Sequence, residues 1–414
     1  MTTGSRPRIR QLDVLRGVAV VLVLGRHMGP RPTSAPLIVQ SVLDVWVRVG
    51  WTGVDLFFVL SGFLVSGLLF HEYGETGVLR VGRFLVRRGL RIYPAFYVFL
   101  LATSIVAGTI ATRRFVAEAL FVQNYTTGLW DHTWSLAIEE HFYVLLALVV
   151  LILVRWASSR PLIGAASGRP RDPFRPLLPI FGVVAGVALL LRILTAQYGK
   201  PYFVHHLYPT HLRLDSLLFG VLLAYLSWSN GERFALRVRQ HRSLLVLTAL
   251  ACLAPAFFLP AIDPIMETIG FTSLYVGFGA LLIATLHGAE RSDAALSALR
   301  TWLGAPRRLM GSTLAGIGVY SYSIYLWHLA VKQWAVPYFV RVLGWRPETM
   351  AALAVYFAAT IAIGVLMGRL IEIPTLALRE RWMPGVSHTT VSDGAVSDTT
   401  SSDTTVDELP SRAA

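Results

Sequence analysis

Two ionisable side chains, Arg16 and His27, lie eleven residues apart in the first long apolar stretch of the chain. Eleven residues make about three helical turns, so in a helix both side chains lie on one face, roughly 16 Å apart along the axis. Ionisable groups in such a stretch are costly inside a membrane, and they usually have a function. An imidazole can take a proton from a hydroxyl group and return it, which makes His27 a candidate general base.

Four later apolar stretches also carry ionisable groups, and each group falls at the same expected depth. Each could bind a substrate, although one buried His or Asp can also do no more than tie two helices together by a hydrogen bond. Neighbouring positions on a helix point about 100° apart, so only one of two adjacent glutamates can face the centre, and we favour the first. The candidates are Asp55, Glu139, Glu140, Asp215 and His328.

A pair of arginines, Arg88 and Arg91, lies in the sequence RRGLRIYP directly before the third apolar stretch. Residues three apart share a helix face, and guanidinium groups bind phosphate oxygens through paired hydrogen bonds. The excess of basic residues in cytoplasmic segments of membrane proteins explains the same arginines equally well. The motif alone leaves both interpretations open.

The chain has none of the short motifs GxSxG, P-loop, CxxC or HExxH. Three histidines, His205, His206 and His211, cluster near one connection but lack acidic partners at the spacing of a zinc site. We therefore expect no metal.

Helices that cross a membrane must position these side chains. Of the 414 residues, 54% are hydrophobic and 15% are charged, against roughly 25% charged in an average soluble domain. This composition excludes an ordinary soluble enzyme and a disordered protein, and the single cysteine, Cys252, excludes an intrachain disulfide. A bilayer-spanning helix needs about 17–25 apolar residues. We predict ten such helices, at approximately 12–29, 52–71, 92–110, 134–154, 177–196, 212–228, 243–260, 269–287, 313–335 and 349–371.

The basic residues alternate from one connection to the next. If the N-terminus is cytoplasmic, the cytoplasmic segments hold 23 arginines and the opposite segments hold 7 basic residues. This asymmetry predicts a multi-pass protein of the cell membrane with both termini in the cytoplasm. The net charge of +13 then reflects membrane topology, and we expect no nucleic-acid partner.

The domain organisation follows from the same pattern. We predict an all-α, polytopic membrane domain over residues 1–385 and a disordered cytoplasmic tail over 386–414, which is rich in Ser, Thr and Asp. The longest outer connection, 113–133, has aromatic residues among polar ones and is expected to hold a short interfacial helix.

Six segments together resemble the acyltransferase-3 family, membrane proteins that O-acylate cell-envelope glycans and some natural products. Each segment is a loose match alone, but their order over about residues 10–372 is specific. Some members carry a further hydrolase-like domain outside the membrane, and we expect none in this chain. The segments are QLDVLRGVAVVLVLGRH, WTGVDLFFVLSGFLVSGLL, RRGLRIYP, WSLAIEEHFY, RLDSLLFG and YSYSIYLWH.

The resemblance implies that His27 is the central catalytic residue and that Arg88 and Arg91 contact the acyl donor, usually acyl-CoA. Arg16 would add to this donor site. Glu139 would orient the imidazole, as the carboxylate does in a catalytic triad. His27 would act either as a general base on the acceptor hydroxyl or as the nucleophile that carries the acyl group, and both routes stay open.

For the acceptor we expect a hydroxyl of an envelope glycan, a glycolipid or a glycosylated small molecule such as a macrolide. The transferred acyl group is expected to be short, and the protein is expected to contact membrane lipid. A secondary transporter is the alternative, because ten spans with buried charges also suit a carrier, although its ion site would lie near the middle of the membrane. A lipid-carrier glycosyltransferase would need clustered acidic residues that hold a metal, and the sequence shows no such cluster.

Overall fold

The computed structural model describes residues 9–159, 172–198, 207–287 and 304–384. Within these ranges the chain forms helices and connecting turns but no β-strand, in agreement with the predicted all-α class. The elements of the first half are α1 (Arg10–His27), α2 (Leu37–Val49), η1 (Gly50–Thr52), α3 (Gly53–Thr76), α4 (Val81–Ala107), α5 (Arg113–Ala119), α6 (Trp134–Ser158) and α7 (Leu177–Tyr198).

In the second half three π-helical turns continue or precede α-helices: η3 before α12, η4 after α15 and η5 after α17. Such turns occur mostly as local bulges and are frequent at functional sites. The elements are η2 (Thr210–Leu212), α9 (Leu214–Gln240), α10 (Arg242–Leu253), α11 (Pro255–Phe258), η3 (Met266–Gly270), α12 (Phe271–His287), α14 (Gly304–Val319), α15 (Ser321–Ala330), η4 (Val331–Ala335), α16 (Val336–Val342), α17 (Met350–Met367), η5 (Gly368–Glu372) and α18 (Ile373–Trp382).

All ten predicted stretches coincide with helices, but fewer of these helices are long and apolar enough to cross a bilayer. In the described ranges six meet that requirement, or eight if each of two bent helix pairs counts as one span. The first helix, α1, is unusually polar for a span because its 18 residues include Arg10, Asp13, Arg16 and Arg26. The fold is therefore that of a multi-pass membrane protein, while the count of ten and the orientation of the termini stay predictions.

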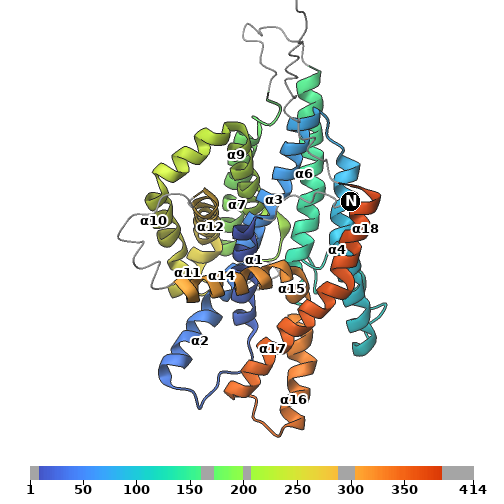
Figure 1. The fold of residues 1–414 in the computed structure, drawn as a ribbon, viewed down its shortest axis with the longest axis vertical. Helices are drawn as coiled ribbons and strands as arrows, with labels where there is room; N and C mark the ends of the chain where they lie inside the picture. The colour runs from blue at the N-terminus through green and yellow to red at the C-terminus, as the bar shows by residue number, and fades with distance from the viewer. Residues whose placement is uncertain (1–8, 160–171, 199–206, 288–303, 385–414) are drawn as a thin grey trace, which may run out of the picture.

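The helices α1 and α3 lie at the centre of the bundle (Figure 1). On one side of them are α7, α9, α10 and α12, and on the other side are α4, α6 and α18. The chain bends by 74° between α14 and the helix that begins with α15, so that α14 crosses α1 and the segment of α15 and α16 runs in another direction (Figure 1). This bend brings the start of α15 against the central helices.

Glycines allow the central helices to approach closely. A Cβ atom at Gly62 of α3 would lie 1.9 Å from the carbonyl oxygen of Leu217 on α9, and one at Gly220 would lie 2.3 Å from that of Val59. The contact of α1 with α14 is as close, since a Cβ atom at Gly318 would lie 1.8 Å from the Asp13 carbonyl oxygen. Helices in membranes commonly pack through such small residues.

Two connections contain helices of their own. The short helix expected in 113–133 is α5, and the Thr112 hydroxyl caps it by accepting from the Phe115 N–H. By contrast, the sequence does not predict α2, because residues 30–51 fall between two apolar stretches. The predicted tail over 386–414 and the pair His205 and His206 lie outside the described residues.

Candidate active site

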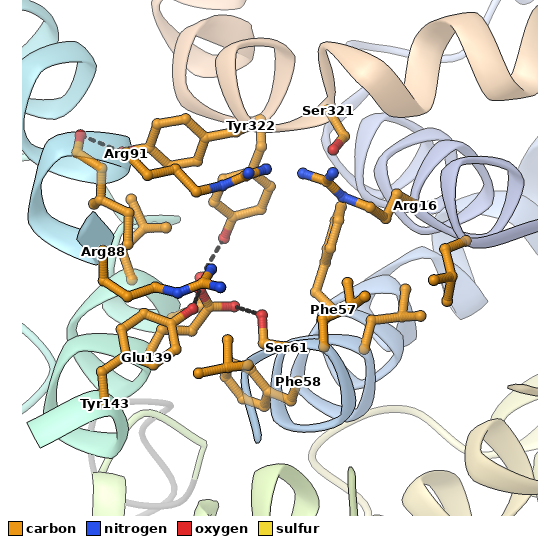
Figure 2. A pocket seen from close by; sticks show the side chains of 18 of the residues that line it. Arg16, Phe57, Phe58, Ser61, Arg88, Arg91, Glu139, Tyr143, Ser321 and Tyr322 are labelled. Atoms are coloured by element: carbon orange, nitrogen blue, oxygen red, sulfur yellow. Dashed lines mark hydrogen bonds between the residues drawn. The ribbon is translucent and has the colours of Figure 1, made fainter. Parts of the chain in front are cut away.

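Three arginines converge on a cavity of about 340 Å³ between α1, α3, α4, α6 and α15. Arg16 comes from α1, and Arg88 and Arg91 come from α4, where a separation of three residues puts them on one face. Figure 2 shows the three guanidinium groups pointing into the same space from different sides. Within the described part of the chain, none of the three forms an ion pair. The cavity can therefore offer several hydrogen-bond donors to an anionic ligand.

The wall of the cavity also carries acceptors, and the first of them is Glu139. Its carboxylate accepts hydrogen bonds from the hydroxyl groups of Ser61 and Tyr143, each at 2.9 Å (Figure 2). The ring of Tyr143 lies in turn 6.0 Å from the Arg88 guanidinium carbon. Glu139 is thus held among the arginines without being directly paired to one of them.

The neighbouring Glu140 has a different environment. Its carboxylate accepts from the Tyr93 hydroxyl at 2.9 Å, and it is not among the described residues that line the cavity. The rotation of about 100° between adjacent helix positions accounts for the difference. The structure therefore brings Glu139, and not Glu140, to the arginine cavity.

The predicted catalytic histidine lies in a separate cluster. His27, at the end of α1, has its Nδ1 atom 3.1 Å from Nε2 of His328 on α15 and 3.1 Å from the Val23 carbonyl oxygen. The rings of His27 and His328 are 4.9 Å apart, and the ring of His132 lies 4.7 Å from that of His328. Among the described residues no three ligands have the arrangement of a metal site. The cluster is instead held by hydrogen bonds between rings and to carbonyl groups.

Tyr325 separates the histidine cluster from the arginine cavity. It lines the cavity, and its ring lies 5.6 Å from that of His328 and 5.4 Å from that of His132. Its hydroxyl donates to the His132 carbonyl oxygen at 2.6 Å and lies 2.7 Å from the Ser135 hydroxyl. Of the described residues, Arg16 lines the cavity and His27 does not.

This separation bears on the expected role of Glu139. We predicted that its carboxylate orients the imidazole of His27. In the structure, Glu139 is instead hydrogen-bonded to Ser61 and Tyr143, and His27 is hydrogen-bonded to His328. Sequence spacing placed both residues at one depth, but depth alone does not fix which helix faces meet.

Asp55 and Asp215, predicted to bind substrate, are fully buried in ion pairs outside the cavity. Asp55 pairs with Arg213 at 2.5 Å, and Asp215 pairs with Arg192 at 2.8 Å. Arg192 also donates to Thr272, and the Arg213 guanidinium carbon lies 3.9 Å from the centre of a phenyl ring on α12. The network joins α3, α7, α9 and α12, so its evident role is to fix these helices to one another.

The connection 113–133, which carries His132, is organised by a buried carboxylate. Glu118 accepts from the N–H groups of Leu129 and Trp130, at 2.6 and 3.3 Å, and from the Thr133 hydroxyl at 2.5 Å. Burial raises the pKa of Glu118 to about 7 and lowers the pKa of His132 to about 3. His132 is therefore neutral at physiological pH.

Several residues of these sites were not predicted. Arg192 lies within the apolar stretch 177–196 and Glu372 directly follows the stretch 349–371, so their charge was a usable signal; Glu372 lines the cavity and accepts from Ser323 at 2.9 Å. His132 lies in a polar connection, where a histidine gives no such signal. Tyr325 looks like an ordinary core aromatic, and only its contacts reveal its position.

Comparison with known proteins agrees with the architecture. The family described as an acyltransferase domain, Acyl_transf_3, matches residues 9–369. A Staphylococcus aureus (strain COL) protein named as an O-acetyltransferase is 26% identical over 393 residues, which cover 89% of this chain and 58% of that protein.

Two further relatives are called OatA. The peptidoglycan O-acetyltransferase OatA of Listeria monocytogenes is 25% identical over 399 residues, which cover 90% of this chain and 56% of the relative. The O-acetyltransferase OatA of Staphylococcus aureus (strain NCTC 8325) is 26% identical over 360 residues, which cover 80% of this chain and 51% of the relative. The chain spans a little over half the length of these curated relatives. Since the family match extends over nearly all of its helices, the chain belongs to the acyltransferase-3 family.

Proposed function

We propose that this chain is a membrane O-acyltransferase that moves a short acyl group, such as acetyl, from acyl-CoA to a hydroxyl of a cell-envelope glycan. The observation that carries the proposal is the convergence of Arg16, Arg88 and Arg91 on one cavity, with an imidazole at the opposite end of the helix that provides Arg16. The names of the relatives, which include a peptidoglycan O-acetyltransferase, suggest peptidoglycan as the glycan.

The cavity suits the phosphate groups of the donor. Each guanidinium group offers several N–H donors in a planar arrangement that matches phosphate oxygens. Its volume of about 340 Å³ is at the lower end of the range for small-molecule sites, about 300–1,000 Å³. It would hold a part of acyl-CoA, and the flexible pantetheine arm would carry the thioester on towards His27.

The chemical step would take place at His27. The imidazole removes the proton of the acceptor hydroxyl, the oxygen attacks the thioester carbonyl, and the CoA thiolate leaves with the proton that the imidazole returns. In the rival route His27 itself takes the acyl group before passing it to the acceptor. In both routes the thioester would pass Tyr325, which lines the cavity and contacts the ring of His328.

The test uses the protein in lipid nanodiscs with radiolabelled acetyl-CoA and a soluble peptidoglycan oligosaccharide. We expect an alkali-labile acetyl ester on the glycan, which His27→Ala abolishes at equal protein content. Because the chain spans about half the length of its relatives, this assay also tests whether it completes the transfer alone. No ester with acetyl-CoA, or undiminished ester with His27→Ala, would contradict the proposal.

The alternative function, transport, predicts a different result. A carrier would exchange a labelled solute across proteoliposome membranes without forming an ester. Counterflow of acetyl-CoA or of the oligosaccharide, with no ester formed in the same vesicles, would favour a carrier. We expect ester formation without such exchange.

A further inference from the structure

Three imidazoles lie together at the end of α1: a hydrogen bond joins His27 to His328, and the ring of His132 packs against that of His328. The ring of His328 lies between those of His27 and His132, and each ring has a nitrogen within hydrogen-bonding distance of a backbone oxygen. The distances are 3.1 Å from His27 Nδ1 to the Val23 oxygen, 2.5 Å from His328 Nδ1 to the Tyr325 oxygen and 3.0 Å from His132 Nε2 to the Leu326 oxygen.

These carbonyl groups determine which nitrogens carry protons. A carbonyl oxygen can only accept a hydrogen bond, so His27 Nδ1 and His328 Nδ1 must both be protonated. A neutral His328 then has its lone pair on Nε2. That lone pair is 3.1 Å from the His27 Nδ1 atom, so the single Nδ1–H of His27 is shared, in a three-centre hydrogen bond, between the Val23 carbonyl oxygen and His328 Nε2. The contacts with the Val23 and Tyr325 carbonyl groups therefore require the same direction for the hydrogen bond between the rings: His27 Nδ1 donates and His328 Nε2 accepts.

We infer that His328 is a positioning residue, which accepts the Nδ1–H of His27 and so keeps the Nε2 lone pair of His27 free for the acceptor hydroxyl. The inference rests on the proposed function for its role in transfer, but the tautomer itself follows from the hydrogen bonds. Within the described ranges, Nε2 of His27 makes no hydrogen bond, whereas every other nitrogen of the His27–His328 pair is occupied. In a catalytic triad a carboxylate performs this task. Here a second, neutral imidazole does so.

The pair can also accommodate the proton during the reaction. When Nε2 of His27 takes the proton of the acceptor hydroxyl, the Nδ1 proton can shift along the 3.1 Å hydrogen bond towards Nε2 of His328. The charge is then shared by two rings, and the Tyr325 carbonyl oxygen accepts from the second one. The same proton returns from His27 Nε2 to the departing thiolate, so the pair ends as it began.

His132 supports this arrangement from the other side. Its ring lies at 77° to that of His328 at a centroid distance of 4.7 Å, and its Nε2–H donates to the Leu326 carbonyl oxygen of α15. Its Nδ1 atom is buried without a hydrogen-bond partner. Because the Nδ1 atom of His132 carries a lone pair and no hydrogen, it cannot donate a hydrogen bond to Nε2 of His328. The Nε2 atom of His328 therefore accepts from His27.

The first experiment determines the tautomer directly. Solid-state ¹⁵N NMR of histidine-labelled protein in lipid bilayers distinguishes protonated from unprotonated ring nitrogens, and the His27→Ala variant assigns the signals by subtraction. We expect Nδ1 of His27 to be protonated and Nε2 to be unprotonated at neutral pH. The reverse tautomer in the wild-type protein would overturn the inference, whether or not the protein transfers acyl groups.

The second experiment compares two substitutions of His328. In His328→Gln the side-chain oxygen takes the place of Nε2 and can accept from His27, whereas in His328→Asn the amide takes the place of Nδ1 and the acceptor is lost. We expect kcat to fall about 10- to 100-fold with asparagine, as for the loss of one buried hydrogen bond, and to recover most of that loss with glutamine. KM for acetyl-CoA should stay unchanged in both variants.

His287→Asn serves as the matched control, because the ring of His287 packs on Phe234, on elements remote from the cluster. A purely structural role of His328 would lower protein yield and thermal stability with asparagine and glutamine alike. Equal kcat values for the two folded variants would therefore overturn the inference. A wild-type protein that forms no ester would instead contradict the proposed function, and the NMR result would still decide the tautomer.

Discussion

Glu139 and Glu140 are adjacent in the sequence, yet only the carboxylate of Glu139 faces the arginine cavity, while that of Glu140 accepts from Tyr93. We therefore expect Glu139→Gln to reduce acyl transfer about 10- to 100-fold, since a neutral amide is a weaker acceptor than a carboxylate for the hydroxyl groups of Ser61 and Tyr143 on the cavity wall. Glu140→Gln keeps an acceptor for Tyr93 and should change transfer by less than about 3-fold. Initial rates in nanodiscs measure both, and a larger loss with Glu140→Gln would show that the assignment is reversed.

The arginines of α4 should determine affinity for the donor. Arg88→Ala should weaken acetyl-CoA binding about 10- to 100-fold, because a charge-assisted hydrogen bond contributes about 1.5–3 kcal/mol. Arg88→Lys should restore only part of the affinity, since an ammonium group keeps the charge but not the planar pair of donors.

Isothermal titration of the purified variants with acetyl-CoA measures this difference. Arg83→Ala is the control, because Arg83 lies on the same helix but is not among the described residues of the cavity. Equal affinity in the wild-type protein and in Arg88→Ala would remove Arg88 from the donor site. Full recovery with lysine would show that only its charge matters.

The connection 113–133 should respond to pH through Glu118. Its pKa is raised from an ordinary value of 4.5 to about 7 in the folded protein. A carboxyl group with a raised pKa stabilises the folded connection most fully below pH 4.5, and this contribution is lost as the pH rises through about 7. We expect amide hydrogen exchange in residues 120–133 to accelerate between pH 4.5 and about 7 by more than the intrinsic pH dependence of exchange.

The variant Glu118→Gln is the control for this prediction. The amide oxygen still accepts from Leu129 and Trp130, and the amide N–H groups can donate to the Thr133 hydroxyl, but the group no longer titrates. Exchange in this variant should show the intrinsic pH dependence alone. The same excess acceleration in both proteins would assign the effect to another group.

The ion pair of Asp55 with Arg213 should matter for folding. Asp55→Leu leaves the buried Arg213 charge uncompensated, and removal of one member of such a pair typically costs about 3–5 kcal/mol. The double variant Asp55→Leu with Arg213→Met should be less destabilised than the sum of the single variants. Unfolding midpoints in detergent check this. A strictly additive double variant would show that the pair contributes no coupling energy to folding. A stable Asp55→Leu protein that has lost donor binding would instead assign Asp55 to the substrate site.

The sequence predicted the helices and part of the site because both depend on local properties. The length of the apolar stretches predicted the helices, and the spacing of Arg88 and Arg91 predicted that the two side chains share a helix face, as they do at the cavity. The partners of the buried charges were not predictable, because Asp55 and Arg213 meet only through the rotation and packing of α3 against α9. The same holds for His27 and His328, which are 301 residues apart in the chain.

The position of Tyr325 has a consequence for the energy supply of the cell. A continuous aqueous path from the arginines to His27 would conduct protons down their electrochemical gradient, and every copy of the protein would then dissipate stored energy. Tyr325 lines the cavity, its ring packs against those of His328 and His132, and its hydroxyl is fixed to the His132 carbonyl and to Ser135, which makes it the candidate seal of such a path. We expect Tyr325→Ala, but not Tyr325→Phe, to make proteoliposomes leaky to protons in a pH-sensitive dye assay, and equally tight vesicles would show that another residue forms the seal. The side chain that borders both the arginine cavity and the histidine cluster would then also prevent the leakage of protons across the membrane.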